Sequence, residues 1–289
     1  MNKKAKEFFD NLKGKKVAFV GMGVANVPCA EFMAKLGIEV YACDKRDKAY
    51  IGAEICERLE RLGVKFSLGD SYLDILPDMD LVFRSHGILP FQNPWIGECI
   101  KRGQKVTTEM EIFFKLCPAK IVAVTGSNGK TTTTTLIAKM LEKQGHKVYL
   151  GGNIGKALMP ELDTITENDI AVVELSSFQL LTMGNLVDSP DIAVVTNIEC
   201  THQDHHISLD EYVDAKRNIL IYQNSDCRTI LNADCDYSIG NSVYHDMRYD
   251  VRGKLFEFSI KHPVENGAYM KDNGDIVYCE NGEETYVMN

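Results

Sequence analysis

The stretch from Val122 to Leu141, "VAVTGSNGKTTTTTLIAKML", constrains the fold most. An apolar run is followed by a Gly-Ser-Asn-Gly turn, and Lys130 then opens a run compatible with a helix. A buried strand, a glycine turn and a helix beginning at Lys-Thr point backbone N–H groups at an anion, so the pattern predicts a phosphate site. The strict GxxxxGK[ST] spacing fails, because Val124 stands where the first glycine would be. The alternative is a plain turn in which Thr131 or Thr132 caps the helix.

Composition limits the class of protein. The 289 residues are 45% hydrophobic and 25% charged, as in soluble globular proteins, and favour two domains over one. No apolar run approaches the ~20 residues of a membrane span, and the N-terminus does not resemble a secretory signal. Nine cysteines without a CxxC pair indicate a reducing cytoplasm. A net charge of -9 argues against nucleic-acid binding, because phosphate backbones are held by basic patches.

Two series of alternating strands and helices predict an α/β protein with parallel sheets. The segment Cys117–Lys120, "CPAK", separates them, so we expect a Rossmann-like domain over 1–117 and a second α/β domain, similar to P-loop NTPases, over 118–289. A helix is expected over Ser208–Gln223. Asn-Gly pairs at 266, 273 and 281 separate the last short apolar runs and predict an antiparallel β meander, since Asn-Gly favours hairpin turns.

The turn "GMGVAN", Gly21 to Asn26, follows the first predicted strand, and Asp44 lies at a distance suited to a ribose contact. Asn26 replaces the third glycine of GxGxxG, which weakens the dinucleotide fingerprint. Two alternatives remain open: the turn binds no ligand, or it binds the dinucleotide of a nicotinamide-dependent oxidoreductase. A fluorescence titration with NADH distinguishes them.

Four stretches carry a resemblance to a known family. "TGSNGKTT" resembles the ATP-binding turn of the Mur ligase superfamily. "GGNIGKAL", "VVELSSFQL" and "TNIECTHQDHHISLDEYVDAK" are similar to the branch that adds D-glutamate to UDP-N-acetylmuramoyl-L-alanine. The resemblance implies an ATP-dependent amide ligase that works through an acyl phosphate with two Mg²⁺ ions. It further implies a cytoplasmic monomer that serves peptidoglycan precursor synthesis, and so cell-wall formation, cell shape and division.

The resemblance also implies site residues. The catalytic residues implied are Lys130, Glu174, His202 and Lys216. The metal ligands implied are Thr131, Glu174, His202 and Lys216, the last as a carbamate formed with carbon dioxide. From the residues alone, Glu174 is either a magnesium ligand at a strand end or an acid that faces solvent. The segment "HQDHH" is either a polar loop or a metal site. Lys216 is a solvated charge, because an ammonium group does not ligate a cation. The ATP contacts implied are Gly126, Ser127, Asn128, Gly129, Lys130, Thr131 and Thr132. The UDP-substrate contacts implied are Val24, Ala25, Asn26, Asp44, Lys45, Arg46, Ser85, Gly87, Asn153, Ser176 and Gln179.

The sequence departs from the family pattern in three places. His86 stands where proline is usual, and Thr201 stands where an acid or amide is common. The family has a third, C-terminal domain that binds D-glutamate, and the printed sequence ends before it and before an "HN" segment that completes the central domain. We therefore expect weak or no ligase activity from these 289 residues, and a catalytically silent nucleotide-binding module is the alternative function.

Overall fold

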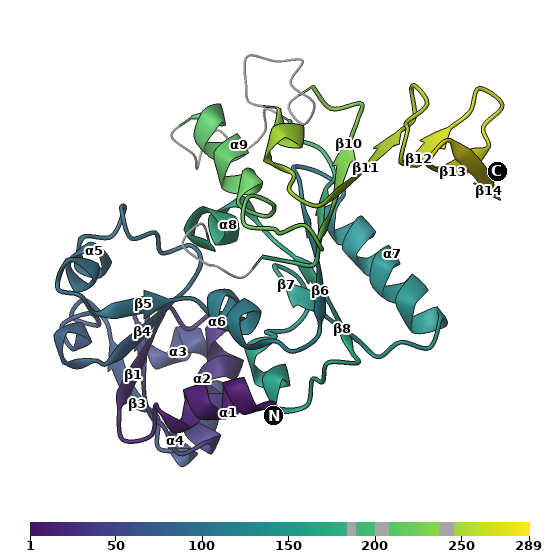
Figure 1. The fold of residues 1–289 in the computed structure, drawn as a ribbon. Coiled ribbons are helices and arrows are strands. Elements are labelled where there is room, and N and C mark those ends of the chain that lie inside the picture. The colour runs from purple at the N-terminus through teal and green to yellow at the C-terminus, as the bar shows by residue number, and fades with distance from the viewer. Residues whose placement is uncertain (184–188, 200–207, 237–245) are drawn as a thin grey trace. The chain divides into compact units, whose positions relative to one another are not determined.

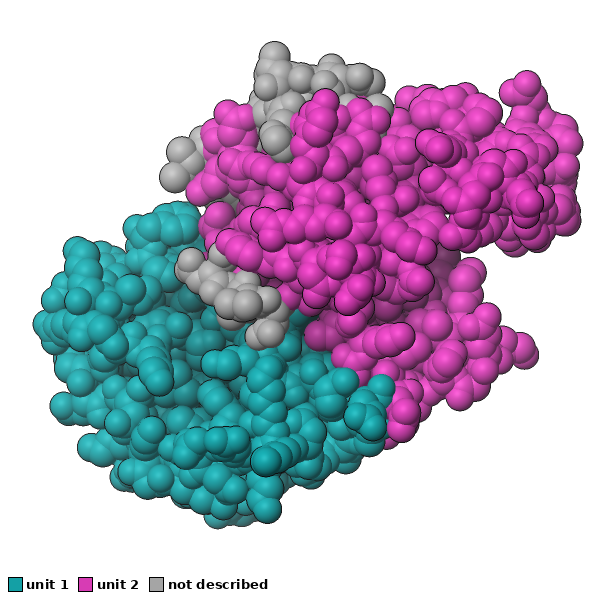
Figure 2. All heavy atoms as spheres, in the orientation of Figure 1, with its two compact units in different colours: residues 1–118, 155–167 teal, residues 119–154, 168–289 magenta. Residues whose placement is uncertain are grey.

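The computed structural model describes residues 1–183, 189–199, 208–236 and 246–289. The chain divides into two compact units (Figure 2). Unit 1 contains residues 1–118 and 155–167, and unit 2 contains residues 119–154 and 168–289. The sequence-based division after residue 117 assigned 155–167 to the second domain, whereas this segment packs in unit 1. In the described ranges, no helix has both the length and the apolar character that a membrane crossing requires.

Unit 1 is built on a five-stranded sheet in the order β3-β2-β1-β4-β5 (Figure 1). Every pairing is parallel, which confirms the predicted Rossmann-like sheet. Its strands are β1 (Lys16–Val20), β2 (Glu39–Asp44), β3 (Lys65–Leu68), β4 (Leu81–Arg84) and β5 (Lys105–Thr107). Its helices are α1 (Lys3–Asp10), α2 (Asn26–Lys35), α3 (Lys48–Ile51), α4 (Ala53–Arg61), α5 (Pro94–Lys101) and α6 (Glu109–Leu116), with short 3₁₀ turns η1 (Leu76–Asp78) and η2 (Met159–Asp163).

Apolar packing explains why 155–167 belongs to unit 1. Its turn η2 contacts α2 and α6, and Leu158, Met159 and Leu162 are fully buried. Burying side chains of this size stabilises the contact by about 1.5–3 kcal/mol each.

Unit 2 is built on a nine-stranded sheet in the order β14-β13-β12-β11-β10-β9-β6-β8-β7. Its strands are β6 (Lys120–Thr125), β7 (Val148–Gly152), β8 (Ile170–Glu174), β9 (Ile192–Val195), β10 (Arg228–Asn232), β11 (Lys254–Ser259), β12 (Gly267–Met270), β13 (Ile276–Glu280) and β14 (Glu283–Met288). Its helices are α7 (Lys130–Lys143), α8 (Ser177–Met183) and α9 (Leu209–Arg217), with the 3₁₀ turn η3 (Met247–Asp250). α7 packs on β6, β7 and β8, and α8 packs against α9 (Figure 1). α9 ends at Arg217, six residues before the predicted end at Gln223.

The C-terminal strands confirm the meander in part. β12, β13 and β14 are antiparallel, and the Asn273 and Asn281 pairs lie at their two turns. The prediction for Asn266 was wrong, because β12 pairs with β11 in parallel. Gly267 has a φ of +134°, and a Cβ there would lie 1.8 Å from the Glu257 carbonyl oxygen. The glycine at 267 therefore allows two strands to approach closely, and no hairpin turn is formed there.

Strand order places the loops that follow each strand. In unit 1 the chain reverses its direction of winding between β1 and β4, and ligands of such sheets bind outside the carboxyl ends at that point. In unit 2, β6 lies between β8 and β9, so the segments after Thr125, Glu174 and Val195 meet at one edge.

Candidate functional site

The turn after β6 has the backbone of an anion site. Gly129 is the N-cap of α7, adopts a φ of +77° and makes no side-chain cap. The alternative in which Thr131 or Thr132 caps the helix is therefore wrong, because both lie inside the helix. The N–H groups of the first turn of α7 have no capping side chain, and the helix dipole adds partial positive charge there.

The segment after β9 holds this turn in place. Ser127 N–H donates to the Asn197 carbonyl over 2.8 Å, and Asn128 N–H donates to Asn197 Oδ1 over 2.9 Å. The Thr196 hydroxyl donates to the Asn128 carbonyl over 2.7 Å. Sequence reasoning did not single out Thr196 and Asn197, although polar residues at the end of an apolar strand were a usable signal.

Lys130 lies across the turn. Its Nζ donates to the carbonyl oxygens of Gly126 and Ser127, at 2.9 Å each. Burial lowers the pKa of Lys130, and the negative charge of Glu174 opposes that shift. A half-buried ammonium beside N–H groups without a capping side chain is suited to the outer phosphates of a nucleotide.

Glu174 ends β8 and is only 1% exposed, so the solvent-facing alternative is wrong. Its Oε2 accepts a hydrogen bond from the Thr131 hydroxyl at 2.7 Å, and its Oε1 accepts one from Asn153 Nδ2 at 2.9 Å. Parallel register sets Val124 opposite Glu174. The carboxylate therefore lies beside the turn 126–129 after β6, which the sequence predicts to bind phosphate (the phosphate turn). A carboxylate and a hydroxyl are oxygen ligands of the kind that Mg²⁺ prefers, so these residues fit the ion.

Lys216 is also buried, at 1% exposure, and is not the solvated charge that its helix position suggested. Its Nζ donates to the Gly126 carbonyl over 2.9 Å and lies 4.4 Å from the centre of the Tyr212 ring. Burial, aided by the charge of Lys130, lowers the pKa of Lys216 to about 7. Tyr212, one helical turn before Lys216, also hydrogen-bonds Ser127 Oγ at 2.9 Å and ties α9 to the phosphate turn. Sequence reasoning missed this tyrosine, which its i, i+4 spacing from Lys216 could have indicated.

His202 lies in 200–207, outside the described residues, as do Thr201 and the rest of "HQDHH". In the part of the chain that is described, no three His, Cys, Asp or Glu side chains gather into a metal-binding group. The described metal candidates are therefore Thr131, Glu174 and Lys216.

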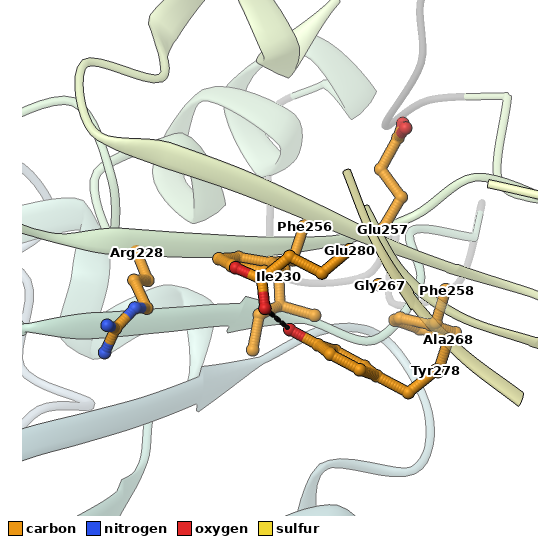
Figure 3. Close-up of a pocket in the computed structure, with 9 residues that line it drawn as sticks. All are labelled: Arg228, Ile230, Phe256, Glu257, Phe258, Gly267, Ala268, Tyr278 and Glu280. Atoms are coloured by element: carbon orange, nitrogen blue, oxygen red, sulfur yellow. Dashed lines mark hydrogen bonds between the residues drawn. The ribbon is translucent and has the colours of Figure 1, made fainter. Parts of the chain in front are cut away.

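A cavity of about 490 Å³ lies beside the phosphate turn. Polar groups of Asn128, Gly129 and Asn197 line one part, and apolar side chains line another: Ile137, Val194, Ile230 and Phe258. A smaller cavity of about 360 Å³ shares Ile230 and Phe258 and continues over β10–β13 (Figure 3). There Tyr278 donates its hydroxyl to Glu280 over 3.0 Å, so part of its polar lining is already paired. The larger cavity, next to the anion site, has the mixed lining that a nucleotide base requires.

Other predicted contacts of unit 2 are engaged with one another. Gln179 is buried, and its Oε1 accepts from Ser176 N–H at 2.9 Å and from the Ser176 hydroxyl at 3.0 Å. These bonds shape the first turn of α8, directly after Glu174. Thr132 lies in the first turn of α7.

Unit 1 has an acidic group at the end of β2. Asp44 Oδ2 accepts from Met22 N–H at 2.7 Å, and the Arg46 guanidinium binds both carboxylate oxygens at 2.8 Å each. Burial raises the pKa of Asp44, but the hydrogen bonds from Arg46 and Met22 outweigh burial, so the pKa lies below its usual value. The Arg46 guanidinium also lies 4.1 Å from the centre of the Tyr50 ring.

The remaining unit 1 candidates lie after β1, β2 and β4. Asn26 is buried and donates to the carbonyls of Val20 and Gly21, which makes it a structural support of the turn. Val24 and Lys45 are exposed, and Ser85 N–H donates to Val20 O over 2.8 Å. The turns that carry Ala25, Ser85 and Gly87 therefore share the edge where the strand order reverses.

Comparison with known proteins agrees with both units. Residues 124–285 match the model of the Mur ligase middle domain, and residues 15–108 match the Mur ligase MurD-like N-terminal domain. The chain belongs to the Mur ligase family.

Individual Mur ligases are similar over nearly the whole chain. The UDP-N-acetylmuramoylalanine--D-glutamate ligase of Acetivibrio thermocellus is 43% identical over 283 residues, which cover 98% of this chain and 58% of that protein. The enzyme of the same name from Ruminiclostridium cellulolyticum is 42% identical over 281 residues, 97% of this chain and 58% of that protein. The chain thus spans a little under three fifths of the length of these relatives.

Solved Mur ligase structures share the fold at low identity. The UDP-N-acetylmuramate:L-alanyl-gamma-D-glutamyl-meso-diaminopimelate ligase from Neisseria meningitides superposes with a TM-score of 0.58 at 16% identity, covering 93% of this chain and 85% of that chain. The UDP-N-acetylmuramate-alanine ligase MurC from Thermotoga maritima gives 0.52 at 20% identity, covering 94% and 60%. At this identity the likeness concerns the α/β architecture alone.

Proposed function

We propose that this chain provides the UDP-substrate and ATP sites of a ligase that joins D-glutamate to UDP-N-acetylmuramoyl-L-alanine. The observation that carries the proposal is the meeting of Lys130, Glu174 and Lys216 at the Gly126 turn. The names of the curated relatives support the choice of substrates. Such a reaction belongs to peptidoglycan precursor synthesis.

The chemistry follows from the side chains at the turn. The alanyl carboxylate attacks the γ-phosphate of ATP, ADP leaves, and the D-glutamate amine then displaces phosphate from the acyl phosphate. Lys130 and the first N–H groups of α7 bind the phosphates and offset the charge that gathers as one anion approaches another. Thr131 and Glu174, with Lys216 as a carbamate and His202, would hold Mg²⁺, which supplies further charge neutralisation when bound. The cavity beside Gly129 would take the adenine base.

Calorimetry on this chain tests the UDP-substrate site. UDP-N-acetylmuramoyl-L-alanine is expected to bind wild-type protein. The Asp44→Asn variant is expected to bind about tenfold or more weakly, because it breaks the pair that orients Arg46 and the Met22 amide. Glu39→Gln, a change at the other end of β2, serves as the control and should bind like wild type. Absence of binding heat from wild-type protein would contradict the proposed substrate.

Lys216 has a test of its own. Its burial and its contacts within the described chain, the Gly126 carbonyl and the Tyr212 ring, support the carbamate, because the amine lies against the turn after β6. In ¹³C-labelled bicarbonate, wild-type protein is expected to show a carbamate carbon resonance that Lys216→Ala and Lys216→Arg both lack. Lys115→Ala changes an exposed lysine of α6 and should keep the resonance. A wild-type spectrum without it rules out the carbamate.

A further inference from the structure

Glu109 is a buried acid that the proposed function does not use. It opens α6, directly after β5, and its side chain is 1% exposed. Neither carboxylate oxygen accepts a hydrogen bond from any residue of the described chain. Burying a carboxylate without hydrogen bonds is costly, so this side chain requires a compensating charge.

Among the described residues, His86 is the candidate for this charge, because the other neighbouring cation is already paired. Glu111 is already satisfied by the Thr107 hydroxyl at 2.7 Å and by Thr108 N–H at 3.0 Å. It also faces the buried Arg84 guanidinium at 4.0 Å, so the charge of Arg84 is matched. Burial lowers the pKa of Arg84, and Glu111 counteracts that shift.

Two other groups face Glu109. Burial, with the charge of Glu109, raises the pKa of the Cys29 thiol well above its usual value, so this thiol is neutral and supplies no positive charge. The His86 imidazole lies with Nε2 3.8 Å from Glu109 Oε1. Charges balance in this cluster when the imidazole carries a proton.

His86 belongs to the loop 85–88 after β4. Arg84 Nη1 donates to the Ile88 carbonyl over 3.2 Å, and Ile88 N–H donates to Ser85 O over 2.9 Å, so the ends of the loop are held from within. Between them lie His86 and Gly87, and the His86 side chain is 21% exposed. The contact with Glu109 is an ionic contact of the middle of this loop.

We propose that Glu109 is a positioning residue whose carboxylate pairs with protonated His86 and so fixes the loop 85–88 for the UDP substrate. The inference deepens the proposed function and rests on it for the identity of the ligand. It assigns neither residue a direct part in the chemistry. Because the pair requires a charged imidazole, substrate affinity is expected to be higher at about pH 6 than at about pH 8.

Calorimetry with UDP-N-acetylmuramoyl-L-alanine at about pH 6 and about pH 8 tests the pair. Its diphosphate diester and its carboxylate stay ionised over that range, so the ligand does not contribute a titration. Wild-type protein is expected to bind about three- to tenfold more tightly at the lower pH, the size of one partly exposed ion pair. Glu109→Gln and His86→Gln are both expected to lose this dependence and to bind at the weaker level, whereas Glu109→Asp retains part of it.

Two matched controls separate the pair from general charge effects. Glu98→Gln removes an exposed acid of α5 in the same unit, and His146→Gln removes an exposed histidine. Both should keep the wild-type dependence on pH. If Glu109→Gln also keeps it, or wild-type affinity does not change with pH, the proposal is overturned.

Hydrogen exchange in the free protein provides a readout that needs no ligand. Amides of residues 85–88 are expected to exchange faster in Glu109→Gln and His86→Gln than in wild type or Glu98→Gln. If the UDP compound fails to bind at either pH while exchange responds as expected, the proposed substrate fails and the pair stands. Unchanged exchange in both variants contradicts the pair, whether or not the ligand binds.

Discussion

Replacing Lys130 by alanine is expected to weaken Mg-ATP binding by about 100-fold or more, which corresponds to about 3 kcal/mol. The Lys130 ammonium lies over the phosphate turn, and no other lysine of the described chain except Lys216 donates to it. Its removal takes away the ammonium that bonds to both Gly126 and Ser127, so the phosphates lose a charged partner at this turn. In a complete ligase the same change should abolish turnover, because the acyl-phosphate step gathers negative charge at this position.

Calorimetry with Mg-ATP measures the effect of Lys130→Ala directly. Lys139→Ala is the matched control, since Lys139 lies on the same helix and its Nζ pairs with the exposed Glu142. The control should bind like wild type. Near-normal affinity in Lys130→Ala would show that the turn after β6 does not hold the phosphates. Loss of binding in both variants would point instead to a general effect of charge.

Gly126→Ala is expected to destabilise unit 2 by about 3 kcal/mol or more and to abolish nucleotide binding. The residue has a φ of +149°, and a Cβ there would lie 1.9 Å from Thr196 Oγ1 and 3.0 Å from the Asn197 carbonyl oxygen. The severe overlap is with the Thr196 hydroxyl, which its hydrogen bond to the Asn128 carbonyl holds in place. Relief therefore requires that this bond break or that the strands β6 and β9, paired up to Thr125 and Val195, move apart.

Gly129→Ala separates the clash from backbone strain. Gly129 also has a positive φ, of +77°, but a Cβ there would meet no atom within 4 Å. This variant should be destabilised only by the backbone strain of a left-handed alanine, about 1–2 kcal/mol. Thermal unfolding of both variants measures the difference. Equal unfolding temperatures would mean that the close packing of the turn on Thr196 does not contribute to the free energy of unfolding.

The burial of Lys216 beside the turn after β6 could not be deduced from local sequence. On a helical wheel, "DEYVDAKRN" has the charges of an exposed surface. The tertiary structure buries Lys216 against the phosphate turn and the Tyr212 ring, where desolvation disfavours the ammonium. Only contacts with residues distant in sequence, such as Gly126, reveal that this lysine belongs to the site.

The Asn-Gly pairs show a related limit of local signals. Asn281 and Gly282 both have positive φ, as a two-residue hairpin turn requires, and the local signal was sufficient there. At Gly267 the same dipeptide serves a parallel pairing with β11, where the absence of a side chain lets Glu257 approach. The Asn-Gly dipeptide indicates that positive φ is tolerated. Whether it forms a hairpin turn or a close parallel pairing depends on which strands are available as neighbours.

The sequence by itself determined the two α/β series and the glycine turn after β6, because periodic burial and glycine-dependent turns depend on short-range sterics. Its motifs also indicated the family. Tertiary structure decided which side chains meet at the turn: Glu174 with Thr131 and Asn153, and Lys216 with Gly126. It also placed 155–167 in unit 1 and set Glu109 beneath His86. These contacts depend on the order of strands in each sheet, which brings together residues that are far apart in the chain and so cannot be derived from local pattern.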